Sequence, residues 1–448
     1  MNILLVIIYY IAVAFGILIY VLMRQKGLSI SDFIMVAITV LFNLSGVIIA
    51  YGIPYGTVSL DTTLYIMYLL FALIVPIGLL FGQRYGIKTV TNYYQRVSDR
   101  LLNCYIALVG LYAIGYFLVI RNSIPLIMLL TGKSAQAVKV ARLQVTLNIT
   151  NYFHLPSFLR FYGLIFDYVS LYVFAVLLVK YLNDKRKYRV KFWIYAVFEF
   201  FLMFYATEKA PLIYLLIIVV FCIYFVYKTK NKGNESFSTV NSINSDRKAK
   251  RKIRFFAIGG AVAFLLLYTF FMGIENYNDS LRSIVSRAFV SQSSSVYLQK
   301  QILDSQYGGC LNGAGIPLTI IDSLIGRNTV NLSEEIYSTL FKHYTALGGG
   351  GTAGSIAIFE MYANFGLIIA VIIVAIVSIV TGVIDKKTTM TIQQAENSEI
   401  PIALKAIIAV VFFRGFLGHF QTFLSFPFII SIPVLIILFM TWTFRHVH

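Results

Sequence analysis

The feature that most constrains this chain is a series of long apolar segments that runs through almost its whole length. A helix that crosses a bilayer needs about 20 mostly apolar residues. Eleven segments meet this requirement or come close to it, at 2–23, 30–52, 63–83, 101–120, 161–182, 192–207, 210–227, 255–274, 355–383, 401–420 and 423–444. We therefore expect an all-α polytopic membrane protein with about 11 transmembrane helices.

The composition excludes an ordinary soluble protein. Hydrophobic residues make up 59% of the chain and charged residues 12%, whereas soluble domains are about 45–50% apolar and about 25% charged. Such a chain has too few charged residues to cover a water-facing surface. The segment 2–23 has neither a basic start nor a small-residue cleavage site, so we expect it to be a retained span and not a removable signal.

The positive charge of the chain predicts its orientation. The net charge is +18, and cytoplasmic loops of membrane proteins collect Lys and Arg. The connections between the spans fall alternately on the two sides of the membrane. One side holds 24 basic residues, at 24–29, 84–100, 180–191, 228–254, 385–400 and the C-terminus, and the other side holds 11. This bias places the N-terminus outside and the C-terminus in the cytoplasm. Because most of the excess follows topology, no nucleic-acid partner is expected.

Three regions follow from the segment pattern. Residues 1–274 hold spans one to eight, with a cytoplasmic linker at 228–254 that is rich in Asn, Ser and Lys. Residues 275–354 form a large outer loop with two short amphipathic helices, and residues 355–448 hold spans nine to eleven. The first loop helix lies within 281–304, and the second begins at Ser333 as N-cap, followed by two acidic residues. A further short amphipathic helix is predicted within 121–160.

Ionisable groups at membrane depth are costly and suggest function by default. The candidates are Asp167, Glu199, Glu208, Lys209, Glu360, Lys405 and Arg414. Each has a structural alternative: Lys405 can extend to the membrane surface, Asp167 and Glu199 can pair with basic groups near the inner leaflet, and Glu208 and Lys209 can form a plain ion pair. Arg414 lies deeper, next to Gly415, and is harder to explain structurally.

The large outer loop adds candidates for anion binding and proton transfer. Arg282 and Arg287 suit phosphate because a guanidinium forms paired, charge-assisted hydrogen bonds, although arginines also bind lipid phosphates. His343 can act as a general base near neutral pH, although a lone His is often structural. The sequence has no P-loop and no Cys/His cluster, so neither a metal nor a cofactor is expected.

Three short segments resemble a known family. Residues 348–366, GGGGTAGSIAIFEMYANFG, resemble the G–G–x–S–x–x–x–E–x–Y–x–N–F–G region of Wzy-type O-antigen and oligosaccharide repeat-unit polymerases. Residues 206–213 are similar to the family's short basic motif between two helices, with Lys209 in place of the usual Arg. Arg-Ala-Phe at 287–289 is similar to the family's loop arginine, and the likeness covers roughly residues 190–440.

The resemblance implies a metal-independent, inverting glycosyltransferase of the C-type superfamily in the bacterial inner membrane. Such an enzyme joins undecaprenyl-diphosphate-linked oligosaccharide repeat units into O-antigen or capsular polysaccharide at the periplasmic face, beside a flippase and a chain-length regulator. It implies that the diphosphate contacts Arg287, Lys209, Arg282 and Arg414, and that His343 or Glu360 deprotonates the acceptor hydroxyl. The residues expected near the glycan are Gly348, Gly349, Gly350, Gly351 and Tyr362.

Two rival functions stay open. An O-antigen ligase performs the same chemistry with a lipid A-core acceptor. A flippase or transporter of lipid-linked oligosaccharide would instead have charged residues along a central cavity, symmetric halves and short loops. The charges here gather on one face beside a loop of about 80 residues at 275–354, which favours the transferase.

Overall fold

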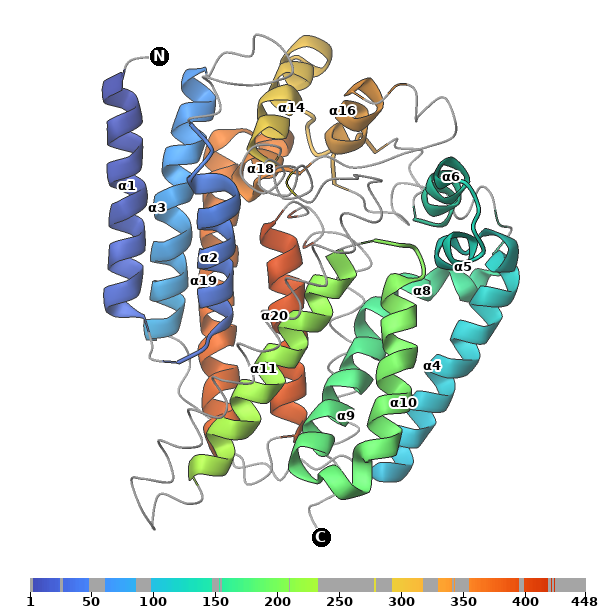
Figure 1. Cartoon of the computed structure of the whole chain (residues 1–448). Coiled ribbons are helices and arrows are strands. Elements are labelled where there is room, and N and C mark those ends of the chain that lie inside the picture. Colours follow the sequence, from blue (N-terminus) through green and yellow to red (C-terminus); the bar gives the residue numbers. More distant parts are fainter. Residues whose placement is uncertain are drawn as a thin grey trace.

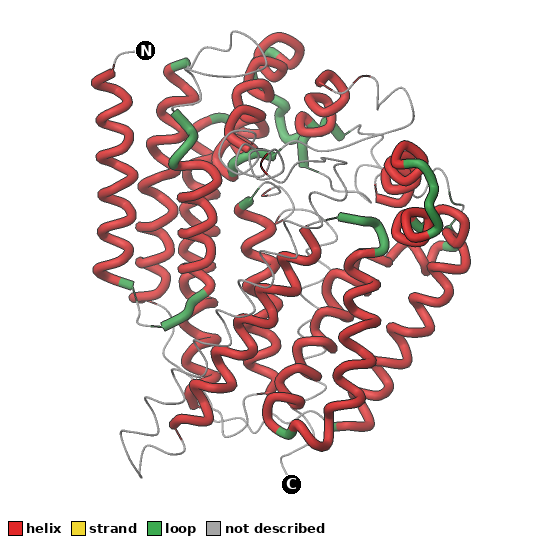
Figure 2. The backbone as a smooth tube through the Cα atoms, in the orientation of Figure 1, coloured by secondary structure: helices red, strands yellow, loops and turns green. Residues whose placement is uncertain are grey.

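Helices make up nearly all of the described backbone, joined by short loops (Figure 2). The computed structural model describes residues 3–24, 27–47, 61–85, 98–146, 153, 155–208, 210–232, 278, 292–316, 329–340, 342, 354–394, 399–417, 420 and 423. No strand occurs within these ranges. The all-α fold predicted from the sequence is confirmed.

The helices are named below by their labels in Figure 1. They are α1 (Ile3–Met23), α2 (Ile30–Ile38), α3 (Thr62–Tyr85), α4 (Asp99–Ile120), α5 (Pro125–Leu130), α6 (Ala135–Thr146), α8 (Tyr162–Leu164), α9 (Leu171–Asn183), α10 (Lys185–Phe204), α11 (Ala210–Lys232), α14 (Gln292–Tyr307), α16 (Leu332–Leu340), α18 (Ala357–Phe365), α19 (Leu367–Gln394) and α20 (Glu399–Phe416). Two π-helical segments, η1 (Thr39–Asn43) and η5 (Ile165–Ser170), continue directly from α2 and into α9. Two 3₁₀ turns, η3 (Arg121–Ser123) and η4 (Ser157–Phe161), follow α4 and precede α8.

Six helices in the described part of the chain are long and apolar enough to cross a membrane. They are Ile3–Met23, Thr62–Tyr85, Asp99–Ser123, Phe158–Asn183, Ala210–Lys230 and Leu367–Gln393, and each coincides with a predicted segment. This confirms a membrane-embedded protein, but the expected count of eleven is not reached. The apolar helical segment Ile30–Asn43 is too short to be included among the six. α10 and α20 are excluded because every 18-residue stretch of either helix holds more than two charged residues. The predicted spans 255–274 and 423–444 lie outside the described residues.

Helix α3 packs along α1 on one side and α19 on the other, and the three lie side by side in Figure 1. The α3–α19 contact is close because small residues face each other at four-residue spacing on both helices. A Cβ atom added at Gly82 would clash with the backbone of Ile379, and one added at Gly382 would clash with the backbone of Leu79. Small residues at this spacing let two membrane helices approach through their backbones.

A second group is built around α9, which packs against α10, α11 and α20. Every residue from Leu171 to Lys180 is buried. Helix α20 contacts α9 and α11 of this group and also α2 and α19 of the first. Figure 1 accordingly shows α20 between the two groups. α20 therefore contacts both groups, which also meet directly where Phe33 of α2 packs against Phe221 of α11.

A buried ion pair ties α20 to α19 and α2. The Lys405 side chain is fully buried, and its Nζ lies 2.6 Å from Asp385 Oδ1 and 2.7 Å from Thr389 Oγ1. Asp385 also accepts hydrogen bonds from the backbone N–H groups of Ile30 (3.0 Å) and Ser31 (3.1 Å) at the start of α2. The alternative that Lys405 extends to the membrane surface is therefore wrong, because its ammonium group is enclosed by acceptors inside the protein.

We call the end of the molecule that carries α5, α6, α14, α16 and α18 the loop end (upper part of Figure 1). Helices α14 and α16 lie within the predicted outer loop, and α6 lies within 121–160, where a helix is expected. The cap of α16 differs from the prediction. Asn331 Oδ1 accepts from the backbone N–H of Ser333 at 3.2 Å and of Glu334 at 3.4 Å, so Asn331 caps the helix in place of Ser333.

The predicted span 355–383 is broken into two helices. α18 ends at Phe365, Gly366 adopts φ 79°, and α19 begins at Leu367. A positive φ is easy for Gly and ends the helical path. The break places Glu360 and Tyr362 on a separate short helix at the loop end, apart from the span that follows.

Candidate functional site

Arg414 in the last turn of α20 is held by Asp167 of η5. Its Nη1 donates to Asp167 Oδ2 at 2.7 Å, and its guanidinium carbon lies 5.9 Å from the centre of the Tyr214 ring. The two charged side chains are 37% and 36% exposed. Asp167 thus pairs with a basic residue of α20 and not with the basic connections near the inner leaflet. Asp167 therefore fixes Arg414 in place, and the Arg414 side chain is still partly exposed.

The π-helical turn explains where Asp167 lies. η5 interrupts the helix that α8 begins and α9 continues, and it carries both Asp167 and Ser170. Such π turns are rare and frequently occur at functional sites. The wider turn shifts these residues relative to the α-helical register of α9.

The connection between α10 and α11 brings a second carboxylate to Arg414. α10 ends at Phe204 and α11 begins at Ala210, which gives the tight hairpin predicted between segments six and seven. Burial raises the pKa of Glu208 in this connection, Asp167 raises it further, and Arg142 of α6 and Arg414 lower it. Among these four residues, Asp167 and Arg414 are in direct contact, and we call Arg142, Asp167, Glu208 and Arg414 together the charge cluster.

Aromatic residues pack beside the charge cluster and make its surroundings rigid. The Tyr116 and Tyr205 hydroxyl groups lie 2.9 Å apart in a hydrogen bond, and their rings meet edge to face. Phe166, next to Asp167, also meets the Tyr116 ring edge to face, with centroids 5.2 Å apart. Such aromatic contacts add stability beyond the area that they bury.

Glu199 lies on α10, and no basic side chain of the described ranges forms an ion pair with it. It is fully buried, and Ser170 Oγ donates to its Oε2. Tyr195 extends the network through a 3.0 Å hydrogen bond with Ser170 Oγ. The structural alternative that Glu199 pairs with a basic group finds no support among the described residues, where its hydrogen-bond partner is the Ser170 hydroxyl group.

Within the segment 348–366, which resembles the polymerase region, Asn364 has a structural role. Asn364 accepts from the backbone N–H of Gly315 at 2.8 Å, and its Nδ2 donates to the carbonyl of Glu360 at 2.8 Å. The Leu311 N–H donates to the Ala363 carbonyl at 2.7 Å. A Cβ atom at Gly315 would meet the Asn364 amide at 2.8 Å, so Asn364 and Gly315 clamp the turn 311–316 onto α18.

Glu360 lies beside this clamp. Its side chain is buried and lines a cavity of about 20 Å³ together with polar side chains that include Gln299, Asn331 and Asn364. That volume holds about one water molecule. A sugar can reach Glu360 only when the turn 311–316 or α16 moves away from α18.

Tyr362 on the same helix faces a separate cation. Lys300 Nζ lies 5.9 Å from the centre of the Tyr362 ring and 3.3 Å from Asp61 Oδ2, and it also bonds to Asp304. Two carboxylates therefore accompany Lys300. This arrangement ties α14 and α18 to the start of α3.

The structure brings some predicted site residues together and leaves others outside its described part. Arg414 and Glu208 meet in the charge cluster, and Glu360 and Tyr362 share α18. The residues outside the described ranges are Lys209, Arg282, Arg287, His343, Gly348, Gly349, Gly350 and Gly351. Arg142 is not among the site residues predicted from the sequence, although its place in the predicted helix within 121–160 puts it on the same side of the membrane as the 207–210 hairpin.

Comparison with known proteins adds no relative: no protein-family model matches the chain, and no curated protein and no solved structure is significantly similar to it. Among the described residues, no three His, Cys, Asp or Glu side chains come together in a group that could hold a metal ion. The charge cluster is therefore interpreted from its own geometry.

Proposed function

We propose that this protein is a polymerase that joins undecaprenyl-diphosphate-linked oligosaccharide repeat units into O-antigen or capsular polysaccharide. It works in the bacterial inner membrane, with the loop end and the N-terminus at the periplasmic face and the C-terminus in the cytoplasm. A flippase supplies its substrate and a chain-length regulator acts beside it. No metal or cofactor takes part in the proposed reaction.

The observation that carries this proposal is the Arg414 side chain, which is held by Asp167 and is partly exposed. A guanidinium has five N–H donors, and within the described residues its one hydrogen-bond partner is Asp167, through Nη1. The remaining donors can bind an anion that enters from the loop end. An anionic lipid diphosphate approaches a membrane protein at this depth because its headgroup lies at the bilayer surface.

The charge cluster suits a diphosphate leaving group. Arg142 and Arg414 offset Asp167 and Glu208, so the four residues carry no net charge when all are ionised. Lys209 follows Glu208 directly in the sequence and adds a positive charge at the hairpin, while Arg282 and Arg287 add two from the loop. Fixed cations stabilise the charge that develops on a leaving diphosphate without a metal.

The proposed reaction is a direct displacement. His343 or Glu360 removes the proton from an acceptor hydroxyl, and that oxygen attacks the anomeric carbon of the donor sugar. The bond from this carbon to the diphosphate oxygen breaks, and the diphosphate leaves with the electron pair. The anomeric configuration is inverted, and the lipid diphosphate departs from the donor.

The test uses purified full-length protein in proteoliposomes with lipid-linked repeat units, and the product lengths are measured by gel electrophoresis and mass spectrometry. We expect Arg414→Ala to lower the rate of bond formation at least about 100-fold, in line with the loss of one fixed charge-stabilising group. The matched control is Arg186→Ala, which removes an exposed arginine near the start of α10 and should leave the rate unchanged.

Three results would overturn the proposal. Wild-type rates in the Arg414→Ala protein would remove Arg414 from the reaction. Glycan that crosses the bilayer without forming a new bond would identify a transporter. Transfer to a lipid A-core acceptor, without elongation of lipid-linked repeats, would identify a ligase.

A further inference from the structure

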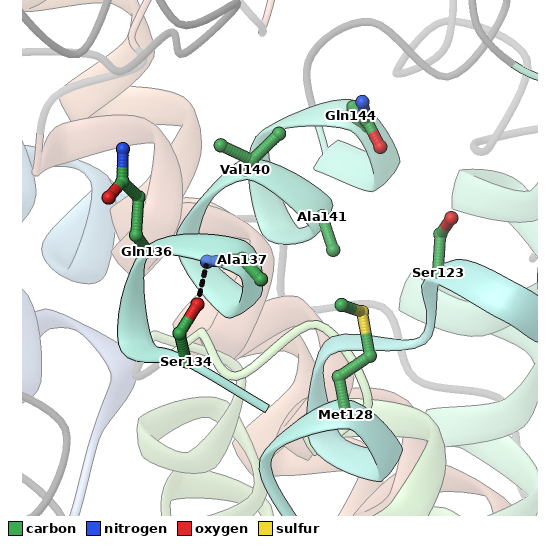
Figure 3. Close-up of a pocket in the computed structure, with 8 residues that line it drawn as sticks. All are labelled: Ser123, Met128, Ser134, Gln136, Ala137, Val140, Ala141 and Gln144. Carbon is green, nitrogen blue, oxygen red and sulfur yellow. Dashed lines mark hydrogen bonds between the residues drawn. The ribbon is translucent and has the colours of Figure 1, made fainter. Parts of the chain in front are cut away.

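A groove outside the charge cluster lies between α5 and α6 at the loop end. It has a volume of about 460 Å³ (Figure 3), which falls in the usual range of about 300–1,000 Å³ for small-molecule sites. Gln136 and Gln144 lie toward opposite ends of α6, and Ser123 lies on the side of Gln144 (Figure 3). The groove is thus long enough to span two turns of a helix.

The lining of this groove is largely apolar, with uncharged polar side chains among the apolar ones. Its polar side chains are Ser123, Ser134, Gln136 and Gln144, and the rest of the lining is apolar, with Met128, Val140 and two alanines. Amide and hydroxyl groups both donate and accept hydrogen bonds. They match a ligand that presents many hydroxyl groups, and the apolar patch between them matches the C–H face of a sugar ring. None of these eight lining residues is charged, so none of them would select an anion.

The groove and the charge cluster are joined through α6 and the α10–α11 hairpin. α6 carries Gln136, Val140 and Gln144 on one face, and Arg142, which acts on Glu208, lies on roughly the opposite face at about 100° per residue. α5 is anchored to the hairpin by a 3.0 Å hydrogen bond from the Leu126 N–H to the Tyr205 carbonyl. α6 thus contributes residues both to the groove and to the charge cluster.

We infer that this groove binds an uncharged stretch of the glycan, a few sugars away from the lipid diphosphate at the charge cluster. The inference rests on the proposed polymerase function and adds a subsite to it. Binding in the groove keeps the growing glycan on the enzyme between successive additions. Loss of the groove should therefore shorten the products more than it slows the first addition.

The direct test is a binding measurement on full-length protein in nanodiscs. The probe is the oligosaccharide released by mild acid from the producing cell's own lipid-linked repeat units, and binding is followed by saturation-transfer NMR and calorimetry. We expect the double variant Gln136→Ala/Gln144→Ala to bind about tenfold more weakly, because two side chains that hydrogen-bond the sugar are removed. Ala137→Trp, which fills the groove, should weaken binding as well.

The matched control is Gln301→Ala, which removes an exposed glutamine from α14, another helix of the loop end, and should bind as the wild type does. The same variants are then compared in the proteoliposome assay. We expect the double variant to form the first new bond at the wild-type rate but to give a shorter modal product.

Unchanged binding and unchanged product length in the double variant and in Ala137→Trp would overturn the inference. So would wild-type protein that polymerises but does not bind the free oligosaccharide. If the wild-type protein binds the oligosaccharide through these residues but forms no bond, the groove stands and the polymerase proposal fails.

Discussion

Arg414 and Lys405 lie on the same helix but have different surroundings, and this difference decides what each can do. Lys405 is fully buried and bonds to Asp385, Thr388 and Thr389. Arg414 has one carboxylate partner and a side chain that is 37% exposed. From their sequence positions alone, both residues are predicted to be cations that lie within the membrane. Their separate roles depend on partners from α19 and η5, which lie far away in the sequence.

Lys405 provides a stability prediction at the residue scale. Lys405→Met should lower the free energy of unfolding by about 3–5 kcal/mol, because it leaves the buried Asp385 carboxylate without its cation. The double variant Asp385→Asn/Lys405→Met should recover a large part of this loss. Unfolding in mixed detergent micelles measures both, and equal losses in the single and double variants would contradict an ion pair that stabilises through charge compensation.

Helix packing shows how much of the fold the sequence predicts at the element scale. Apolar length correctly located α1, α3, α4, α9, α11 and α19, because a bilayer imposes a minimum span. It missed the break at Gly366 and the π turn at η5, because both interrupt a helix inside a continuous apolar run. The contact between Asn364 and Gly315 could not be predicted from the sequence either, because the two residues lie 49 positions apart.

The α3–α19 contact provides a prediction with an internal control. Gly→Ala normally stabilises a helix by about 1 kcal/mol. Gly82→Ala should destabilise the protein instead, because the added Cβ clashes with the α19 backbone. Gly110→Ala on α4 meets nothing within 4 Å, so it should be neutral or stabilising. Thermal unfolding in detergent compares the two, and equal midpoints would show that α3 and α19 are not in such close contact.

At the scale of the whole molecule, α20 links two helix groups whose charged networks lie at its opposite ends. The buried pair Asp385–Lys405 lies where α20 meets α2 and α19, and the charge cluster lies at the other end, beside the hairpin and α6. The charge bias of the connections predicts which of these ends faces the cytoplasm. The bias cannot locate the cluster itself, because its members come from separate connections and helices.

The proposed orientation has its own test. Cysteines are introduced at Ser134 in the loop end and at Lys185 at the start of α10, in a background that lacks the native Cys104, Cys222 and Cys310. An impermeant maleimide added to intact spheroplasts should label position 134 and leave position 185 unlabelled until the membrane is opened. Labelling of position 185 alone in intact spheroplasts would reverse the proposed topology.

The most direct measurement of the central proposal is the release of lipid diphosphate during glycan growth. Wild-type protein in proteoliposomes is given purified lipid-linked repeat units, and free undecaprenyl diphosphate and new glycosidic bonds are counted together over time. Our account predicts one released lipid diphosphate for each new bond, with both products formed at least about 100-fold more slowly by the Arg414→Ala protein. Glycan growth without this release, or release without growth, would contradict it.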